Sequence, residues 1–445
     1  MSVKISKMKT WGRYGAGRSW LRSALAATPV VFAPMALLIL FITLFRFDGS
    51  LPDLYFALRD QGVWHVLDAY RPRFDLQTTL AYSCWVAFQV VLFQWLPGPR
   101  SIGQRTPAGH VLEYRTNGLR AWVVTHLALG ALCWKGGLDP GFVPRNWSGL
   151  VFAMNLFGFL ASALAFAKAH LMPTHLEDAK FSGCWLYDFY MGIELNPRFG
   201  DHFDLKLFTN GRIGMMAWTV IDLSNVAYQY QEFGSVSPSI LLVTILHTIY
   251  VLDFFNNEEW YLRTIDIAHE HYGFYLAWGC FTFLPVMYTL QTQYLGRHPT
   301  SPSGAYLLVA FTTGLVGYAL FRSVNDQKAR VRRLNGDCLV WGRPARYIRT
   351  TYMTSDGWQH ESILLASGWW GWSRHANYLG DLLLSFSMCA LVGTTNVVMW
   401  AYALFMTILL MHRCIRDEVR GRSKYGTAWD DYCKRVPWRL VPGLW

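Results

Sequence analysis

The sequence predicts an all-α, polytopic integral membrane protein. Just over half of its 445 residues are hydrophobic (53%), and only 16% are charged, whereas soluble domains usually contain about a quarter of charged residues. Apolar runs long enough to cross the hydrocarbon layer of a bilayer as a helix recur along the chain. A chain of this size with so much apolar surface is best accommodated in lipid.

About ten transmembrane helices are expected. The apolar runs lie near residues 28–45, 78–96, 118–134, 149–167, 212–229, 239–255, 272–292, 304–321, 379–393 and 395–411. Only a few polar residues, centred on Thr394, separate the last two runs, which predicts a tight helical hairpin. We divide the chain into a segment 1–27 before the first span, an eight-helix region 28–321 and a C-terminal region 322–445.

Basic residues predict the orientation of the chain. The N-terminal segment carries Lys4, Lys7, Lys9, Arg13, Arg18 and Arg22, so the positive-inside rule places it in the cytoplasm. Counting spans from there also places the basic segment 322–378 and the C-terminus in the cytoplasm. This distribution explains most of the net charge of +11 and argues against a nucleic-acid partner, because the charges fall between hydrophobic runs. No cleavable signal peptide is expected.

Two common kinds of site are not expected. The eight cysteines form no CxxC motif and show no Cys/His spacing typical of zinc, so no metal site is predicted. No GxGxxG motif follows a strand, so no soluble Rossmann domain is predicted. Any nucleotide must be held by membrane-embedded or juxtamembrane helices.

A first cluster of polar and aromatic residues, GWWGWSRHANYLGD at 368–381, stands directly before the terminal hairpin. Tryptophan and arginine alone are typical of an aromatic belt at the membrane interface. Asparagine, histidine and aspartate in the same short stretch are costly at membrane depth unless they face a cavity or a ligand. We interpret the cluster as part of a binding site.

Two basic clusters accompany it. In the segment 412–432, the spacing of Arg413, Arg416, Asp417 and Arg420 brings these side chains to one side of a helix; anionic lipid is the alternative ligand here. In 327–336, Lys328 and Arg332 lie four residues apart, although ordinary positive-inside charge also explains them. Arginine forks and aromatic faces suit a phosphorylated dinucleotide.

The fourth cluster, 257–273, joins two apolar runs. Asp266, His269 and Glu270 are spaced to share one face of a helix, where a carboxylate can orient a histidine and shift its pKa for proton delivery. A polar network between helices is the alternative. A metal is not expected, because His269 and His271 point apart on a helix.

The segments LLASGWWGWSRHANYLGD and HRCIRDEVRGRSKYGTAWDDYCKRVPWRLVPG resemble the two C-terminal signatures of the membrane sterol reductase family, which includes the carbon-14 reductases, the lamin B receptor and the delta-7 reductases. NEEWYLRTIDIAHEHYGFYLAWG is similar to the delta-7 branch. The resemblance covers nearly the whole chain. It implies ten transmembrane helices, NADPH as reductant, a sterol substrate held partly by region 28–321, and NADPH held by region 322–445.

The resemblance also implies site residues. Those matching the family's cofactor pocket are Lys328, Arg332, Trp370, Arg374, His375, Asn377, Tyr378, Asp381, Arg413, Asp417 and Tyr425. Tyr432 matches a further pocket residue, and with Asp266, His269 and Glu270 it is our candidate for the acid system. The expected reaction protonates carbon 8 of a 5,7-diene sterol, because the resulting cation at carbon 7 is allylic, and hydride from NADPH then quenches it.

Three alternatives stay open. One is a carbon-14 reductase of the same family. The second is an S-adenosylmethionine-dependent membrane methyltransferase, whose RHxxYxG turn Arg374–Gly380 resembles except for the usual proline after histidine. The third is a non-catalytic sterol-binding protein. The resemblance implies the endoplasmic reticulum membrane for a eukaryotic chain and the inner membrane for a bacterial one, and it leaves the oligomeric state open.

Overall fold

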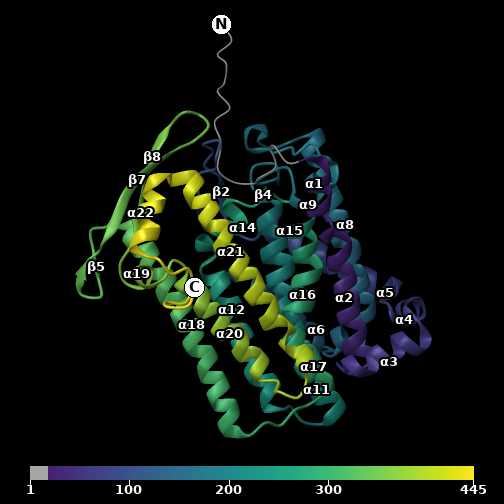
Figure 1. The fold of residues 1–445 in the computed structure, drawn as a ribbon. Helices are drawn as coiled ribbons and strands as arrows, with labels where there is room; N and C mark the ends of the chain where they lie inside the picture. Colours follow the sequence, from purple (N-terminus) through teal and green to yellow (C-terminus); the bar gives the residue numbers. More distant parts are fainter. Residues whose placement is uncertain (1–18) are drawn as a thin grey trace.

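The computed structural model describes residues 19–445, which are mostly helical (Figure 1). Six helices in this part of the chain are long and apolar enough to cross a membrane: Trp20–Arg46, Leu76–Trp95, Trp147–Leu171, Pro238–Asn256, Gly304–Arg333 and Val397–Tyr425. The predicted helical membrane architecture is confirmed. Residues 19–445 form only two-stranded sheets and contain no Rossmann-like domain. The basic residues 4–18, on which the cytoplasmic orientation depends, lie outside the described residues.

The count of ten spans is not confirmed, because four predicted spans are not single long apolar helices. The run 118–134 forms the shorter helix α6 (Gly118–Trp134), and 379–393 overlaps α20 (Ala376–Ala390). The run 212–229 is split between the π-helix η2 (Phe208–Met215) and α11 (Met216–Phe233). The run 272–292 is broken into α15 (Phe274–Trp278), η3 (Gly279–Phe283), α16 (Leu284–Met287) and α17 (Leu290–Arg297). Pro285, which lacks an N–H, lies just after the π-helical turn.

The N-terminal part of the fold packs around a core shared by α2, α5, α8 and the broken helix α15–η3. Trp147, Val151 and Met154 on α8 are buried there. Besides α6, α11 and α15–α17, this part contains the helices α1 (Trp20–Ala26), α2 (Pro29–Arg46), α3 (Leu51–Gln61), α4 (Val63–Tyr70), α5 (Leu76–Trp95), α7 (Phe142–Arg145), α8 (Trp147–Leu171), η1 (Leu176–Asp178), α9 (Trp185–Met191), α10 (Leu205–Leu207), α12 (Pro238–Asn256), α13 (Glu258–Tyr261) and α14 (Ile265–Ala268).

The C-terminal part contains α18 (Gly304–Arg333), α19 (Trp369–Trp372), α20, η4 (Val397–Trp400), α21 (Ala401–Tyr425) and α22 (Thr427–Arg435). Helices α18 and α20 approach closely at two glycines: a Cβ on Gly380 would lie 2.6 Å from the carbonyl oxygen of Gly317. Small residues allow such close contact between membrane helices. α18 is continuous across residue 321, so one helix joins the two predicted regions. The predicted terminal hairpin is present as α20 and α21, with a turn at 391–396.

Four antiparallel hairpins interrupt the helices. They pair β1 (Arg100–Ile102) with β2 (Glu113–Arg115), β3 (Arg198–Phe199) with β4 (Phe203–Asp204), β5 (Leu339–Val340) with β6 (Arg343–Pro344), and β7 (Tyr347–Met353) with β8 (Gln359–Leu365). In the longest, Tyr347 is opposite Leu365 and Met353 is opposite Gln359. This hairpin was not predicted, because its strands lie in a segment rich in polar residues that was interpreted as a basic loop.

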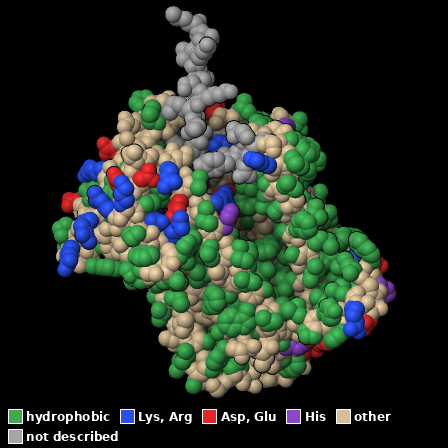
Figure 2. Space-filling model, in the orientation of Figure 1, with side chains coloured by type: hydrophobic (Ala, Val, Ile, Leu, Met, Phe, Trp, Pro, Cys, Tyr) green, Lys and Arg blue, Asp and Glu red, His purple; other side chains and the backbone are tan. Residues whose placement is uncertain are grey.

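Charge and hydrophobicity separate on the surface of the molecule. Figure 2 shows Lys, Arg, Asp and Glu gathered mainly toward the end that carries β7, β8 and α22, whereas much of the side below is hydrophobic. Exposed apolar side chains on the long helices include Val31 and Phe32 on α2, and Leu308 and Val309 on α18. Such faces fit lipid, and the charged end fits water and headgroups.

Candidate active site

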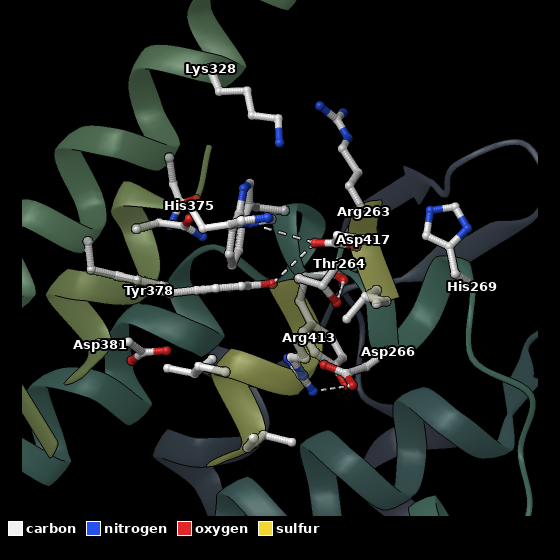
Figure 3. A pocket seen from close by; sticks show the side chains of 18 of the residues that line it. Arg263, Thr264, Asp266, His269, Lys328, His375, Tyr378, Asp381, Arg413 and Asp417 are labelled. Atoms are coloured by element: carbon white, nitrogen blue, oxygen red, sulfur yellow. Dashed lines mark hydrogen bonds and ion pairs between the residues drawn. The ribbon is translucent and has the colours of Figure 1, made fainter. Parts of the chain in front are cut away.

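A cavity of about 1600 Å³ lies where α12, α14 and α15 meet α18, α20 and α21. All of the predicted site residues except Glu270 line it, namely Asp266, His269, Lys328, Arg332, Trp370, Arg374, His375, Asn377, Tyr378, Asp381, Arg413, Asp417, Tyr425 and Tyr432. Figure 3 shows ten labelled lining side chains around this space. The structure therefore brings the cluster 257–273 together with the C-terminal clusters.

The basic end of the cavity is built from α18, α19 and α21. Lys328 Nζ lies 3.9 Å from the ring centroid of Trp370, a cation–π contact. The indole of Trp370 is fixed in turn, because its Nε1 donates to the carbonyl of Val324 at 2.9 Å. Arg332 also lines this end, one turn along α18 from Lys328, as the four-residue spacing predicted.

Two further basic residues, Arg420 and Lys424 on α21, line the same end and were not among the predicted site residues. Their spacing of three and seven residues from Asp417 places all three on one side of a helix, so a sequence signal for them existed. Asp417 binds Arg420, with Oδ1 2.6 Å from Nη2. Lys328, Arg332 and Lys424 line this end as well, and such a cluster of basic side chains suits an anionic ligand.

His375 and Tyr378 form a flat aromatic wall beside Asp417. Their rings are parallel within 6°, with centroids 5.0 Å apart. The Tyr378 hydroxyl donates to Asp417 Oδ2 at 3.5 Å, and His375 Nδ1 lies 3.9 Å from the same oxygen. Burial lowers the pKa of His375 to about 4, so the imidazole is neutral. Within residues 19–445, the buried His375 Nε2 and Asn377 Oδ1 have no hydrogen-bond partner.

Arg374 lines the cavity but is engaged by the C-terminal segment. Its Nη1 donates to the carbonyls of Val436 (2.7 Å) and Pro437 (3.0 Å), and its Nη2 pairs with Glu418. Arg439 binds the same carboxylate, with Nε 2.8 Å from Oε1. The guanidinium of Arg374 thus holds the chain end against α21, and its main contacts are within the protein.

Tyr425 and Tyr432 close the basic end of the cavity. Tyr425 Oη lies 3.4 Å from the Ser362 hydroxyl on β8. The Tyr432 hydroxyl donates to the carbonyl of Trp370 at 3.4 Å, and its ring is buried against Leu364. Tyr432 therefore lies with the Lys328–Trp370 pair, apart from the other three members of the predicted acid system.

The predicted helical face of Asp266, His269 and Glu270 is wrong. Helix α14 ends at Ala268, and His269 departs from helical geometry with φ −137°. Each carboxylate binds an arginine of α21 in place of the histidine: Asp266 Oδ1 lies 2.6 Å from Arg413 Nη2, and Glu270 Oε1 lies 2.5 Å from Arg416 Nη2. The sequence could not show these pairs, because their partners are separated by about 147 residues.

His269 is buried near basic side chains. Burial, followed by the charges of Arg420 and Lys424, lowers its pKa well below the ordinary value, so the imidazole is neutral. Its Nδ1 has no hydrogen-bond partner among residues 19–445. The segment around it is anchored by the buried Lys206, whose Nζ donates to the carbonyls of Ile267 and Glu270, both at 2.6 Å.

The rest of the cavity is largely apolar. Phe274, Phe283, Phe405 and Leu409 line it, together with Ala33 of α2. We call this part the apolar branch. Asp381 extends from α20 toward the cavity, on the same side as Tyr378 (Figure 3). Two tyrosines of the cavity wall, Tyr190 and Tyr275, were not predicted, because they come from separate short helices with no recognisable spacing. No group of side chains suited to a metal ion occurs within 19–445.

Comparison with known proteins identifies the family. Residues 54–445 match the model of the Ergosterol biosynthesis ERG4/ERG24 family. The chain is 41% identical to 7-dehydrocholesterol reductase of Xenopus laevis, over 96% of this chain and 94% of that protein. It is 44% identical to 7-dehydrocholesterol reductase of Danio rerio, over 84% of this chain and 80% of that protein. It is 35% identical to Delta(14)-sterol reductase of Methylotuvimicrobium alcaliphilum, over 97% and 96%.

This chain belongs to the ERG4/ERG24 sterol reductase family. The match to the family model begins at Leu54 and extends to Trp445, so it includes every predicted site residue. As a sterol reductase of this family, the protein is an oxidoreductase of the membrane. The cavity described above joins all of these predicted residues but Glu270, and it is the candidate active site.

Proposed function

We propose that this sterol reductase uses NADPH to reduce the delta-7 double bond of a 5,7-diene sterol. One observation carries the proposal: a single cavity joins an end lined by basic side chains to an apolar branch. A phosphorylated dinucleotide and a sterol have these opposite requirements, and hydride transfer needs them in one space. The identity of 41% and 44% to two 7-dehydrocholesterol reductases supports the choice of double bond.

The residues at the basic end fit NADPH. Lys328, Arg332 and Lys424 would bind its phosphates as charged donors. The parallel rings of His375 and Tyr378 offer a flat face to one of its rings. When bound, NADPH supplies the hydride of the reaction.

Asp266 is our candidate for facing the positive charge that develops on the sterol. Protonation at carbon 8 gives an allylic cation, and a carboxylate fixed nearby in a dry cavity stabilises such a charge. Arg413 holds Asp266 in place through the 2.6 Å ion pair. His269, also in the cavity wall, is neutral and can relay a proton, because one imidazole nitrogen accepts while the other donates. Tyr432 lies at the basic end and Glu270 lies outside the cavity. We therefore propose that these two residues hold neighbouring side chains in position and do not transfer the proton.

Incubation of the purified protein with NADPH and 7-dehydrocholesterol, beside a carbon-14 diene sterol, tests the proposal by mass spectrometry. The expected result is reduction of 7-dehydrocholesterol at the delta-7 bond. Reduction of the carbon-14 diene alone would instead identify a delta-14 reductase, the alternative favoured by the 35% identity to Delta(14)-sterol reductase. Binding of S-adenosylmethionine without binding of NADPH would overturn the proposal.

The same proposal gives the location of the protein. We place it in the endoplasmic reticulum membrane if the chain is eukaryotic and in the inner membrane if it is bacterial, with both termini in the cytoplasm. The basic end of the cavity then opens on the side where NADPH is available. Labelling of single cysteines introduced at each terminus in sealed vesicles tests this orientation.

A further inference from the structure

The wall of the cavity carries a polar group beside the apolar branch, the hydroxyl of Tyr275. The hydroxyl of Tyr275 donates to Glu270 Oε2 at 2.5 Å. Glu270 is buried and ion-paired with Arg416, whose Nη2 lies 2.5 Å from Oε1. A phenol has one proton, and here that proton is committed to a carboxylate. Toward the cavity, Tyr275 Oη can therefore act only as an acceptor.

A second tyrosine complements this acceptor. Tyr190 on α9 also lines the cavity, and its ring centroid lies 6.1 Å from that of Tyr275. Within the described residues its hydroxyl has no hydrogen-bond partner, so its proton is available to a ligand. Both tyrosines line the cavity and their rings lie near each other, so one ligand hydroxyl group can contact both.

We propose that Tyr190 and Tyr275 form a recognition site for the hydroxyl group of the sterol. An alcohol donates one hydrogen bond and accepts others, so it satisfies both tyrosines at once, whereas an ester, ether or ketone at the same position cannot donate to Tyr275. The inference rests on the proposed function, because it assumes a sterol in the apolar branch.

The position of the site along α21 suits a sterol. Arg416, which orders Glu270 and Tyr275, is three residues beyond Arg413, a rise of about 4.5 Å along a helix. Arg413 holds Asp266 at the proposed reaction centre. Carbons 3 and 7 of a sterol lie in adjoining rings, a comparable separation. A sterol hydroxyl on carbon 3 would then reach the tyrosines while carbon 7 stays near Asp266.

One other acceptor in the cavity wall is a weaker candidate. Asn210 Oδ1 has no hydrogen-bond partner within 19–445, but the oxygen atom is fully shielded, and the amide nitrogen lies 3.7 Å from Cys280 Sγ. Asn210 lies in the π-helix η2 and Cys280 in η3, so a ligand could not reach this oxygen without a change in the packing of the two segments. Tyr275, which is only partly buried, needs no such movement.

Competition binding tests the recognition site without turnover. Tritiated 7-dehydrocholesterol is bound to the purified protein in detergent and displaced by unlabelled 7-dehydrocholesterol or by its 3-methyl ether. The native protein should prefer the alcohol by about tenfold, the value of one hydrogen bond. Tyr275→Phe should abolish this preference, because the acceptor is gone, and Tyr190→Phe should weaken binding of both ligands.

Tyr306→Phe is the matched control. Its hydroxyl donates to the carbonyl of Ala390 at 3.0 Å, and it does not line the cavity, so the preference for the alcohol should persist. Equal binding of alcohol and ether by the native protein would overturn the hydroxyl site, and a preference retained in Tyr275→Phe would overturn its assignment to Tyr275. Preferential binding of the alcohol without reduction by NADPH would contradict only the proposed function.

Discussion

Asp266 Oδ1 lies 2.6 Å from Arg413 Nη2, and this ion pair joins the segment after α13 to α21 across 147 residues of sequence. Both side chains line the cavity and are largely shielded from solvent, with exposed fractions of 18% and 25%. The pair fixes the only carboxylate that the predicted acid system contributes to the cavity.

Breaking the Asp266–Arg413 pair should lower activity through a coupled effect. Asp266→Asn and Arg413→Gln should each reduce kcat strongly, and the double variant should lose less than the sum of the two. A double-mutant cycle on kcat/KM should give a coupling energy of about 1–3 kcal/mol. Asp430→Asn is the control, because it breaks the exposed pair between Asp430 on α22 and Arg422 on α21 and should change little. Strict additivity would mean that the pair has no joint role.

Removing charge at the basic end should weaken binding of NADPH selectively. Lys328→Gln and Arg332→Gln should each raise the KM for NADPH by about tenfold or more, the value of a charge-assisted hydrogen bond, while the KM for sterol stays near that of the native protein. Arg100→Gln, at an exposed pair with Glu113 away from the cavity, should behave like the native protein. An unchanged KM for NADPH in both Lys328→Gln and Arg332→Gln would remove these residues from the phosphate site.

His375 should make the protein less stable as the pH falls from about 6.5 to 4. Burial lowers its folded-state pKa to about 4, so across this range the unfolded chain binds a proton that the folded protein does not. Stability then rises with pH. His375→Gln removes this proton uptake on unfolding. The slope of Tm against pH, measured in detergent, should therefore become shallower, by the amount that corresponds to about one proton bound on unfolding. An identical slope in the two proteins would show that His375 is protonated in the fold.

The contact between α18 and α20 should not tolerate a side chain. Gly380→Ala places a Cβ 2.6 Å from the carbonyl oxygen of Gly317, and relieving this clash should cost about 1–3 kcal/mol. We expect a lower Tm in detergent and reduced activity, because α18 and α20 also carry Lys328 and Asp381. Gly130→Ala on α6, where nothing lies within 4 Å, should preserve or raise Tm. Equal Tm values for the two variants would contradict the close helix contact.

The sequence by itself determined the membrane character, the helical class and nearly all of the site residues that were found in the cavity wall. Long apolar runs and basic segments are local properties, and residues such as Lys328 and Arg332 or Arg413 and Asp417 are placed together by helical spacing alone. Family signatures added His375, Asn377 and Asp381. These features needed no knowledge of how one helix packs on another.

Only the tertiary structure decided which groups meet across the cavity. Glu270 lies behind Tyr275 and outside the cavity, and Asp266 forms an ion pair with Arg413, not a contact with His269. The β7–β8 hairpin and the break of the span at 272–292 were likewise not predicted. The physical reason is that these outcomes depend on contacts between distant segments and on short irregular backbone, where local periodicity carries no information about the partner.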